Sequence, residues 1–270
     1  MRSLMLAALL AQRIVSTAPS ITEMLYSLGL GDRVVAVTMY CHYPPEARQK
    51  PKIGTYLSPD LEAMLRVKPD LIVTLESAPN VRDKLPALRV PALVLRNDTV
   101  AHILESMVTL GERTGVPAVA RERVAAIGED LKLLQERAAK LPRRSVMFVV
   151  GRTPGTVQDL VVVGGGSYLN ELLERAGGRN AFADTRITYP KVSREEVLAR
   201  RPEVVIDMGD MADTDKVSEA HKRAVVELWK PVAPWARVYA VASDIFVVPG
   251  PRVAQATREM GRMIHPEAGW

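Results

Sequence analysis

The sequence predicts an α/β protein with two parallel-sheet lobes joined by one long, rigid helix. Three observations favour this fold class: short apolar strands alternate with helices, one pattern of helix, proline and strand occurs twice, and a helical stretch without proline lies between the two copies. The 270 residues are enough to bury two substantial cores. We therefore expect an N-terminal lobe at residues 13–117, a connecting helix at 118–141 and a C-terminal lobe at 142–270.

The first lobe begins with a short apolar strand at residues 13–16, followed by a helix at 21–28. Ser20 and Glu23 have the spacing of a capping box, which predicts the start of that helix, and Gly29 would end it. Further buried strands are expected at 34–38, 71–74 and 92–95. Because helices separate these strands, they should pair in parallel through crossover connections.

The connecting helix is predicted from apolar periodicity. Between residues 118 and 141 the apolar side chains recur in alternating steps of four and three, with charged residues on the reverse side. A helix of 24 residues would be about 36 Å long. It would hold two lobes stiffly, whereas a flexible linker would be rich in Gly and Ser. An ordinary helix packed on one domain is the alternative.

The second half repeats the α/β pattern. It predicts helices at 167–176 and 250–263, and strands at 145–150, 161–163, 204–207 and 238–241. The helix from Ser167 ends at Gly177-Gly178, in a pattern similar to that of the first helix of the chain. The second half therefore resembles the first at more than one place.

The clearest repeat joins residues 61–73 and 194–206, each a short amphipathic helix, a proline and a buried strand. Glu62 and Glu195 both lie seven residues before their proline. They are predicted on the side opposite the apolar pairs Met64-Leu65 and Val197-Leu198. Each lobe should therefore present one outward carboxylate from an equivalent helix, which indicates docking and not catalysis.

Composition excludes several kinds of site. The 36 basic and 31 acidic residues give a net charge of only +5 and are interspersed, which argues against nucleic-acid binding. The single cysteine, Cys41, excludes an intramolecular disulfide and any multi-cysteine metal site.

Tyr40, Tyr43 and Tyr56 lie close together in the sequence, which is typical of a surface that binds a flat ligand.

The first eleven residues combine a positive charge with an apolar run, as the start of a secretory signal does. The run is too short to span a bilayer. We expect an exported protein that is soluble once mature, with a misplaced start residue as the alternative.

Over most of its length the sequence resembles the periplasmic binding proteins with a helical backbone, which deliver cobalamin, haem and iron-siderophores to ABC importers. Two motifs are particular to the corrinoid branch of this class: Tyr-x-x-Tyr-Pro-Pro at 40–45 and Tyr-Pro-x-Val-Ser-x-Glu at 189–195. The other matching segments are 61–73, 177–182 and 242–252.

The resemblance implies a monomeric, periplasmic or otherwise extracytoplasmic substrate-binding protein of an ABC importer. It would hold a cobalamin-like corrinoid in the cleft between its lobes and pass it to the permease subunits, with no enzymatic activity, cofactor or metal of its own. Glu62 and Glu195 correspond to the glutamates that dock the permease. The implied ligand contacts are Tyr40, His42, Tyr43, Tyr56, Arg152, Tyr189, Asp244, Phe246 and Arg252.

Other ligands of the same class remain alternatives. Haem is the first. The imidazole of His42 could coordinate cobalt or haem iron, although a hydrogen bond within its loop is the favoured interpretation. An anionic iron-siderophore would favour arginines, for which the candidates are Arg152, Arg186 and Arg252.

A different class is a dinucleotide-binding enzyme, because residues 160–167 run from a strand through Gly164, Gly165 and Gly166 into a helix. That fingerprint is incomplete, since Leu169 stands at the third glycine position and no strand with an acidic residue follows at the required distance. A zinc or manganese site would require more histidines than this chain provides.

Overall fold

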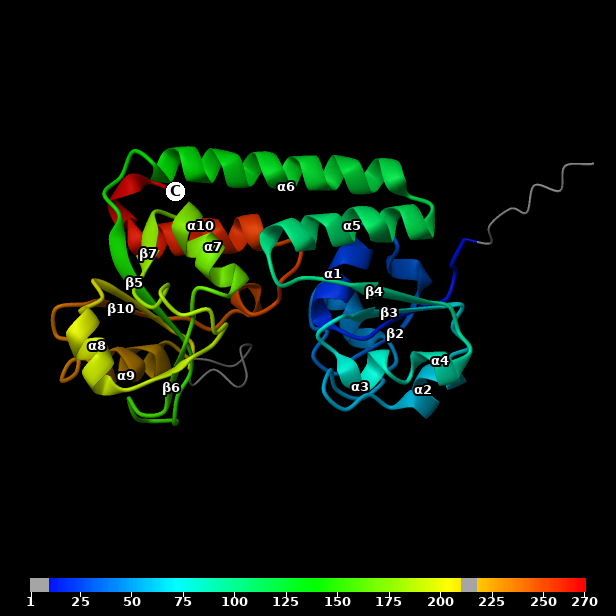
Figure 1. Cartoon of the computed structure of the whole chain (residues 1–270), viewed down its shortest axis with the longest axis horizontal. Coiled ribbons are helices and arrows are strands. Elements are labelled where there is room, and N and C mark those ends of the chain that lie inside the picture. The colour runs from blue at the N-terminus through cyan, green and yellow to red at the C-terminus, as the bar shows by residue number, and fades with distance from the viewer. Residues whose placement is uncertain (1–9, 210–217) are drawn as a thin grey trace, which may run out of the picture. The chain divides into compact units, whose positions relative to one another are not determined.

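The computed structural model describes residues 10–209 and 218–270, so residues 1–9 of the predicted export segment lie outside the described residues. The chain divides into two compact units, which we call the N-terminal lobe and the C-terminal lobe. The first comprises the described residues up to Asn97 together with Ala101–Ala126, and the second comprises Asp98–Val100 and the described residues of Ile127–Trp270. Each unit has its own β-sheet flanked by helices (Figure 1).

The N-terminal lobe contains the predicted parallel sheet. Its four strands lie in the order β2-β1-β3-β4, and every neighbouring pair is parallel. The predicted strands are all present, with ends shifted by at most one residue, because apolar runs bounded by turns define strands well. The strands are β1 Ile14–Ser16, β2 Val34–Val37, β3 Leu71–Leu75 and β4 Ala92–Leu95.

The first helix, α1, spans Pro19–Ser27 and shows that the predicted capping box is wrong. Pro19 occupies the first helical turn, a position that suits its fixed φ, so Ala18 becomes the N-cap and Ser20 lies inside the helix. The Ser20 hydroxyl instead accepts a hydrogen bond from the Asn97 side-chain amide at 3.2 Å. The remaining helices of this lobe are α2 Leu61–Arg66, α3 Pro79–Arg82 and α4 Leu85–Leu88, with 3-10 turns at Gly31–Arg33 and Pro45–Gln49.

The predicted long helix is α6, Pro117–Ala138, and it follows helix α5, Val100–Thr114. Its residues 117–126 belong to the N-terminal lobe and its residues 127–138 to the C-terminal lobe. The predicted apolar stripe is real, because each of its members in the helix is buried or half-buried. They are Ala120, Val124, Ile127, Leu131, Leu134 and Ala138.

The C-terminal lobe contains the predicted parallel strands, β10-β9-β5 with β7, and adds two antiparallel pairs that the sequence did not predict. The order is β10-β9-β5-β6-β8, with β7 also pairing β5. Strand β6 runs antiparallel to both β5 and β8, because the eight residues between β5 and β6 are too few for a crossover. The strands are β5 Arg144–Gly151, β6 Leu160–Val162, β7 Gly178–Asn180, β8 Lys191–Val192, β9 Val204–Asp207 and β10 Arg237–Ala240.

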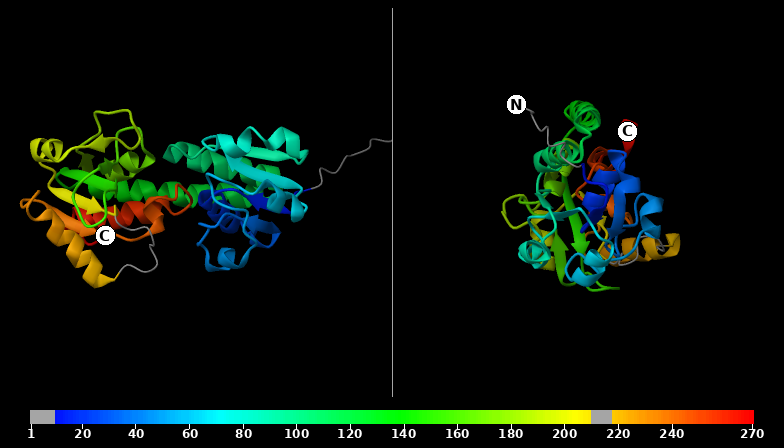
Figure 2. Two further views of the ribbon diagram at one scale, coloured as in Figure 1. Left: turned by 90° about the horizontal axis from the view of Figure 1, so that it is seen from below. Right: turned by 90° about the vertical axis from the view of Figure 1, so that its right-hand side faces the viewer.

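Helices lie on both sides of the strands of the C-terminal lobe (Figure 2). They are α7 Tyr168–Arg175, α8 Arg194–Arg200, α9 Glu219–Trp229 and α10 Val253–Ile264, with 3-10 turns at Asp244–Phe246 and Pro266–Ala268. In residues 10–209 and 218–270, no helix is both long and apolar enough to cross a membrane.

The repeat seen in the sequence is also a repeat in structure, and it centres on α2 and α8. Both helices begin with a side-chain cap: Asp60 accepts from the backbone N–H of Ala63, and Ser193 accepts from that of Glu196. Both are followed by a non-glycine residue in the left-handed region, Lys68 with φ +46° and its counterpart Arg201 with φ +45°.

The residue after each proline links the helix to the sheet in the same way. Asp70 accepts a hydrogen bond from the backbone N–H of Arg13 at 2.9 Å, next to β1. Glu203 accepts one from the backbone N–H of Ser145 at 3.0 Å, at the start of β5. The two lobes therefore fix the turn after α2 and the turn after α8 to the neighbouring strand by equivalent contacts.

Candidate ligand and docking surfaces

The N-terminal lobe gathers exposed aromatic and apolar side chains in two loops beyond the carboxyl end of β2. Tyr40 is 59% exposed, and Tyr43, Met39 and Leu57 are exposed as well. The backbone N–H of Met39 donates to the Gly54 carbonyl at 2.9 Å, which holds the two loops side by side. Ligands of open α/β sheets bind beyond the carboxyl ends of the strands, so this surface is a candidate ligand site.

Tyr56 joins the same surface through β3. Its hydroxyl lies 2.8 Å from the hydroxyl of Ser77, which follows the carboxyl end of that strand. The three tyrosines that the sequence singled out therefore lie in two loops joined by the hydrogen bond between Met39 and Gly54. Met39 and Leu57 were missed, although each is an apolar residue next to a tyrosine in a loop, and that position was the signal that could have found them.

Cys41 and His42 point to different surroundings. Cys41 is fully buried, with its sulfur 3.1 Å from the Thr22 hydroxyl and 3.2 Å from that of Thr38. Burial raises the pKa of its thiol, although these hydrogen bonds oppose the shift, so Cys41 is a packed residue and not a nucleophile. His42 is half-buried beside the tyrosines.

In the C-terminal lobe, the 183–190 segment exposes Ile187 and Tyr189. The glycine run 164–166 holds this segment. The backbone N–H groups of Gly164 and Gly165 donate to the carbonyls of Thr188 and Thr185 at 3.0 and 2.9 Å. Partial burial raises the pKa of the Tyr189 hydroxyl, although a hydrogen bond with Ser167 opposes the shift. Tyr189 is therefore a neutral phenol at physiological pH, able to donate a hydrogen bond.

The glycine run leaves no room for a phosphate. A Cβ added to Gly164, Gly165 or Gly166 would lie 2.0, 2.3 or 2.2 Å from a backbone carbonyl oxygen of the 183–190 segment. Glycine is required there because two stretches of backbone are in close contact. Since the amides of Gly164 and Gly165 already donate within the lobe, the dinucleotide-binding interpretation has no structural support.

Replacing Gly164 by alanine is expected to lower the free energy of unfolding by about 1–3 kcal/mol, because the new methyl group would overpack the contact with the 183–190 segment. Urea denaturation would measure the loss. Gly128→Ala is the matched control, since Gly128 lies in α6 with open space where a Cβ would be added, and alanine there should be neutral or stabilising. Equal stability of the Gly164 variant and the native protein would contradict the close contact.

Two of the predicted ligand contacts are core residues. Arg152 has a fully buried side chain, and its Nε donates to Asp207 Oδ2 at 2.9 Å. Phe246 is also buried and packs edge-to-face on Phe148, with ring centroids 5.6 Å apart. Neither side chain is accessible, which corrects the prediction that these two residues line a ligand surface.

Asp244 and Arg252 bind each other. The Arg252 guanidinium lies 3.0 Å from Asp244 Oδ1, and both side chains remain partly accessible. The pair can offer a ligand hydrogen-bonding groups with little net charge. Arg186, in contrast, is exposed on the same segment as Tyr189.

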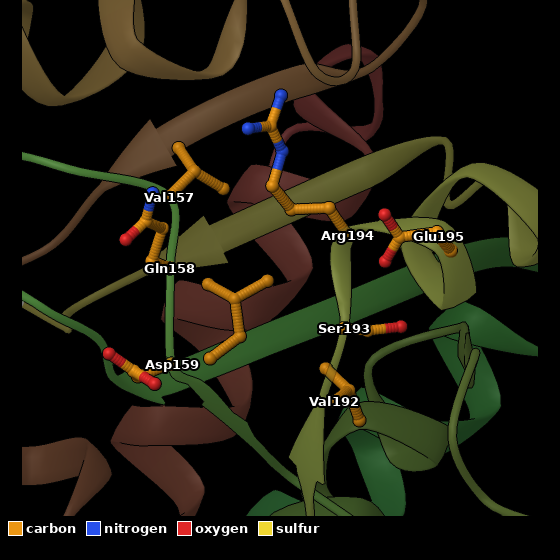
Figure 3. A pocket seen from close by; sticks show the side chains of 8 residues that line it. Val157, Gln158, Asp159, Val192, Ser193, Arg194 and Glu195 are labelled. Carbon is orange, nitrogen blue, oxygen red and sulfur yellow. The ribbon is translucent and has the colours of Figure 1, made fainter.

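The two docking candidates are exposed in equivalent places. Glu62 lies in the first turn of α2 and Glu195 in the first turn of α8, and both side chains face solvent. Beside Glu195 is an open pocket with a volume of about 190 Å³, between α8 and the turn before β6. Figure 3 shows Asp159 on one side of this pocket and Arg194 and Glu195 on the other, with the two latter side chains pointing in different directions. Its apolar lining is Val157, Leu160 and Val192.

The described residues hold no group of three or more His, Cys, Asp or Glu side chains suited to a metal ion. The geometry of both lobes instead offers exposed aromatic loops and charged helix ends, which suit binding of a small molecule and of a protein partner.

Residues 14–229 match the model of the periplasmic binding protein family, and the chain belongs to that family. Its members bind solutes, so this chain is a binding protein and not an enzyme. The chain is 30% identical to a vitamin B12-binding protein from Yersinia pestis (strain Pestoides F) over 261 residues, which are 95% of this chain and 88% of that protein.

Solved structures confirm the predicted fold class. A periplasmic haem-binding protein from Roseiflexus sp. RS-1 has a TM-score of 0.80 at 24% identity, covering 96% of this chain and 99% of that one. The periplasmic vitamin B12-binding protein of Vibrio cholerae has a TM-score of 0.78 at 25% identity, with the same coverage. A periplasmic haem-binding protein from Pseudomonas aeruginosa has a TM-score of 0.80 at 24% identity, covering 96% of this chain and 94% of that one.

Proposed function

We propose that the protein is the periplasmic substrate-binding component of an ABC importer and that it captures a cobalamin-like corrinoid. The observation that carries this proposal is the tyrosine surface of the N-terminal lobe beyond the carboxyl end of its sheet, where Tyr40 and Tyr43 are exposed and Tyr56 is half-buried. A corrinoid is a wide macrocycle with an apolar plane and amides at its edge. Phenol rings can pack on the plane while their hydroxyls bind the amides.

Two further observations support this ligand. The C-terminal lobe exposes Tyr189 with a neutral hydroxyl, and it adds the nearly neutral Asp244–Arg252 pair. The Yersinia pestis relative is named for vitamin B12 binding. Because the Tyr189 hydroxyl and the Asp244–Arg252 pair carry little net charge, they suit a ligand without a strong negative charge.

Haem is the second candidate. Half-buried His42 stands beside Tyr40 and Tyr43, and histidine and tyrosine are both axial ligands of haem iron. The Roseiflexus and Pseudomonas structures are of haem-binding proteins. An anionic siderophore fits less well, because Arg152 is buried against Asp207 and Arg252 is paired with Asp244.

A titration with three ligands tests the proposal. The purified protein is mixed in turn with cyanocobalamin, haemin and a ferric catecholate siderophore, and the absorbance that stays with the protein after gel filtration is measured. We expect retention of cyanocobalamin at one molecule per chain. Retention of haemin alone would replace the corrinoid by haem, and retention of none of the three would overturn the proposal.

Truncation of Tyr56 or Tyr189 to alanine is expected to weaken corrinoid binding by about 1–3 kcal/mol each, because each removes an aromatic contact surface. Fluorescence or absorbance titration would measure the change. The control is Tyr56→Phe, which keeps the ring and removes the hydroxyl that lies near Ser77. This variant should keep most of the affinity. Titration curves that do not change for the alanine variants would remove both tyrosines from the site.

We further propose that the importer's permease docks on Glu62 and Glu195. Both carboxylates are exposed on helices that each lobe holds in the same way, and basic residues of the permease would be their partners. Exposed charges steer association and set the orientation of the partners.

A further inference from the structure

Helices α2 and α8, which carry the proposed docking glutamates, each also expose a leucine at the same position of the repeat. Leu65 is 42% exposed and Leu198 is 49% exposed, and each follows its glutamate by three residues. The sequence had placed both leucines on the buried side. Only the preceding residue, Met64 in α2 and Val197 in α8, is buried.

One exposed leucine has no particular meaning, because single apolar side chains are common on protein surfaces. Two at equivalent positions of a repeat need an explanation. The two helices differ in sequence at most other positions: Ala63 corresponds to Glu196, and Arg66 to Ala199. The shared outward-facing residues of these helices are the glutamate and the leucine.

Helix geometry brings these two side chains together. Residues three apart are neighbours on one face of a helix, so Glu62 and Leu65 form one small patch, and Glu195 and Leu198 form another. The caps at Asp60 and Ser193 and the left-handed residues Lys68 and Arg201 give the two patches the same local backbone. The labels α2 and α8 in Figure 1 mark the two helices.

We propose that Leu65 and Leu198 are the apolar parts of two equivalent docking patches, and that their partner is the permease, which presents the same surface twice. Each of its surfaces would offer a basic side chain to the glutamate and an apolar seat to the leucine. An apolar contact next to a charged one is the usual composition of a protein interface. Two equivalent patches on one chain match a partner built from two identical subunits. This inference rests on the proposed function.

The test replaces Leu65 and Leu198 by serine, singly and together, in the full chain. The readout is uptake of radiolabelled cyanocobalamin by cells whose own copy of the gene is deleted. The matched control is Leu133→Ser, because Leu133 is an equally exposed leucine on α6, at 53%. Ligand titration and urea denaturation of each purified variant show whether binding and folding are intact.

We expect the double variant to take up cyanocobalamin at least about tenfold more slowly at limiting ligand, while its ligand affinity and its stability stay unchanged. Each single variant should lose less than the double variant, and the two single variants should lose about the same amount. Native uptake in the double variant would overturn the inference, as would an equal loss in Leu133→Ser. A loss confined to one lobe would overturn the equivalence of the two patches.

Failure of the proposed function gives a different result. In that case the native protein itself would not restore cyanocobalamin uptake, or charge reversal at Glu62 and Glu195 would leave uptake unchanged. If the glutamate variant loses uptake while the leucine variants keep it, the docking proposal stands and the leucine inference alone is rejected.

Discussion

Replacing Asp207 by alanine is expected to destabilise the C-terminal lobe by about 3–5 kcal/mol, because it leaves the buried Arg152 guanidinium without its carboxylate. The Asp207 carboxylate accepts from Arg152 Nε at 2.9 Å, from Trp229 Nε1 at 2.6 Å and from the backbone N–H of Gly209 at 2.7 Å. The carboxylate is therefore the acceptor shared by three donors: one from the residue after β5, one from α9 and one from the backbone just after β9.

Urea denaturation followed by far-UV circular dichroism would measure this loss. The control is Glu136→Ala, which removes one partner of the exposed ion pair with Lys132 on α6 and should change stability by only about 0–1 kcal/mol. A similarly small loss of stability in Asp207→Ala would mean that the buried Arg152 guanidinium does not need the Asp207 carboxylate, and would contradict this prediction.

Reversing the charge of both Glu62 and Glu195 to lysine is expected to abolish uptake while leaving ligand affinity unchanged. The side chains are exposed and lie on α2 and α8, not in the loops that carry the tyrosines, so neither folding nor the ligand surfaces should change. The two glutamates would attract basic residues of the permease, whereas lysines at these positions would repel them. Repulsion between like charges costs several kcal/mol of binding free energy at an interface.

The measurement pairs uptake of radiolabelled cyanocobalamin in cells with ligand titration of the purified protein. Glu105→Lys with Glu122→Lys is the matched control, because these glutamates are also exposed but lie on α5 and α6, and the change in net charge is the same. Normal uptake by the Glu62 and Glu195 variant would remove the docking assignment.

Local patterns predicted the elements of the fold well. Apolar runs located the strands, and periodicity located α6 to within a few residues, because both signals depend on neighbouring positions along the chain. The capping box at Ser20 failed because two start signals compete there, and Pro19 is the stronger one.

Long-range contacts could not be predicted in the same way. Arg152 was interpreted as a ligand contact because its partner, Asp207, is 55 residues further along the chain. The glycine run resembled a phosphate loop because the segment that fills its space begins about twenty residues later. The placement of Tyr40, Tyr43 and Tyr56 in loops could be predicted, because it depends only on local sequence after a strand.

The burial of Cys41 gives the molecule an internal reporter. Its thiol is the only one in the chain, it belongs to the N-terminal lobe, and its raised pKa and lack of exposure protect it from reagents while that lobe is folded. All three tryptophans, Trp229, Trp235 and Trp270, belong to the other lobe. Thiol labelling and indole emission would therefore follow the melting of the two halves separately, and would show in the native sequence whether they open together.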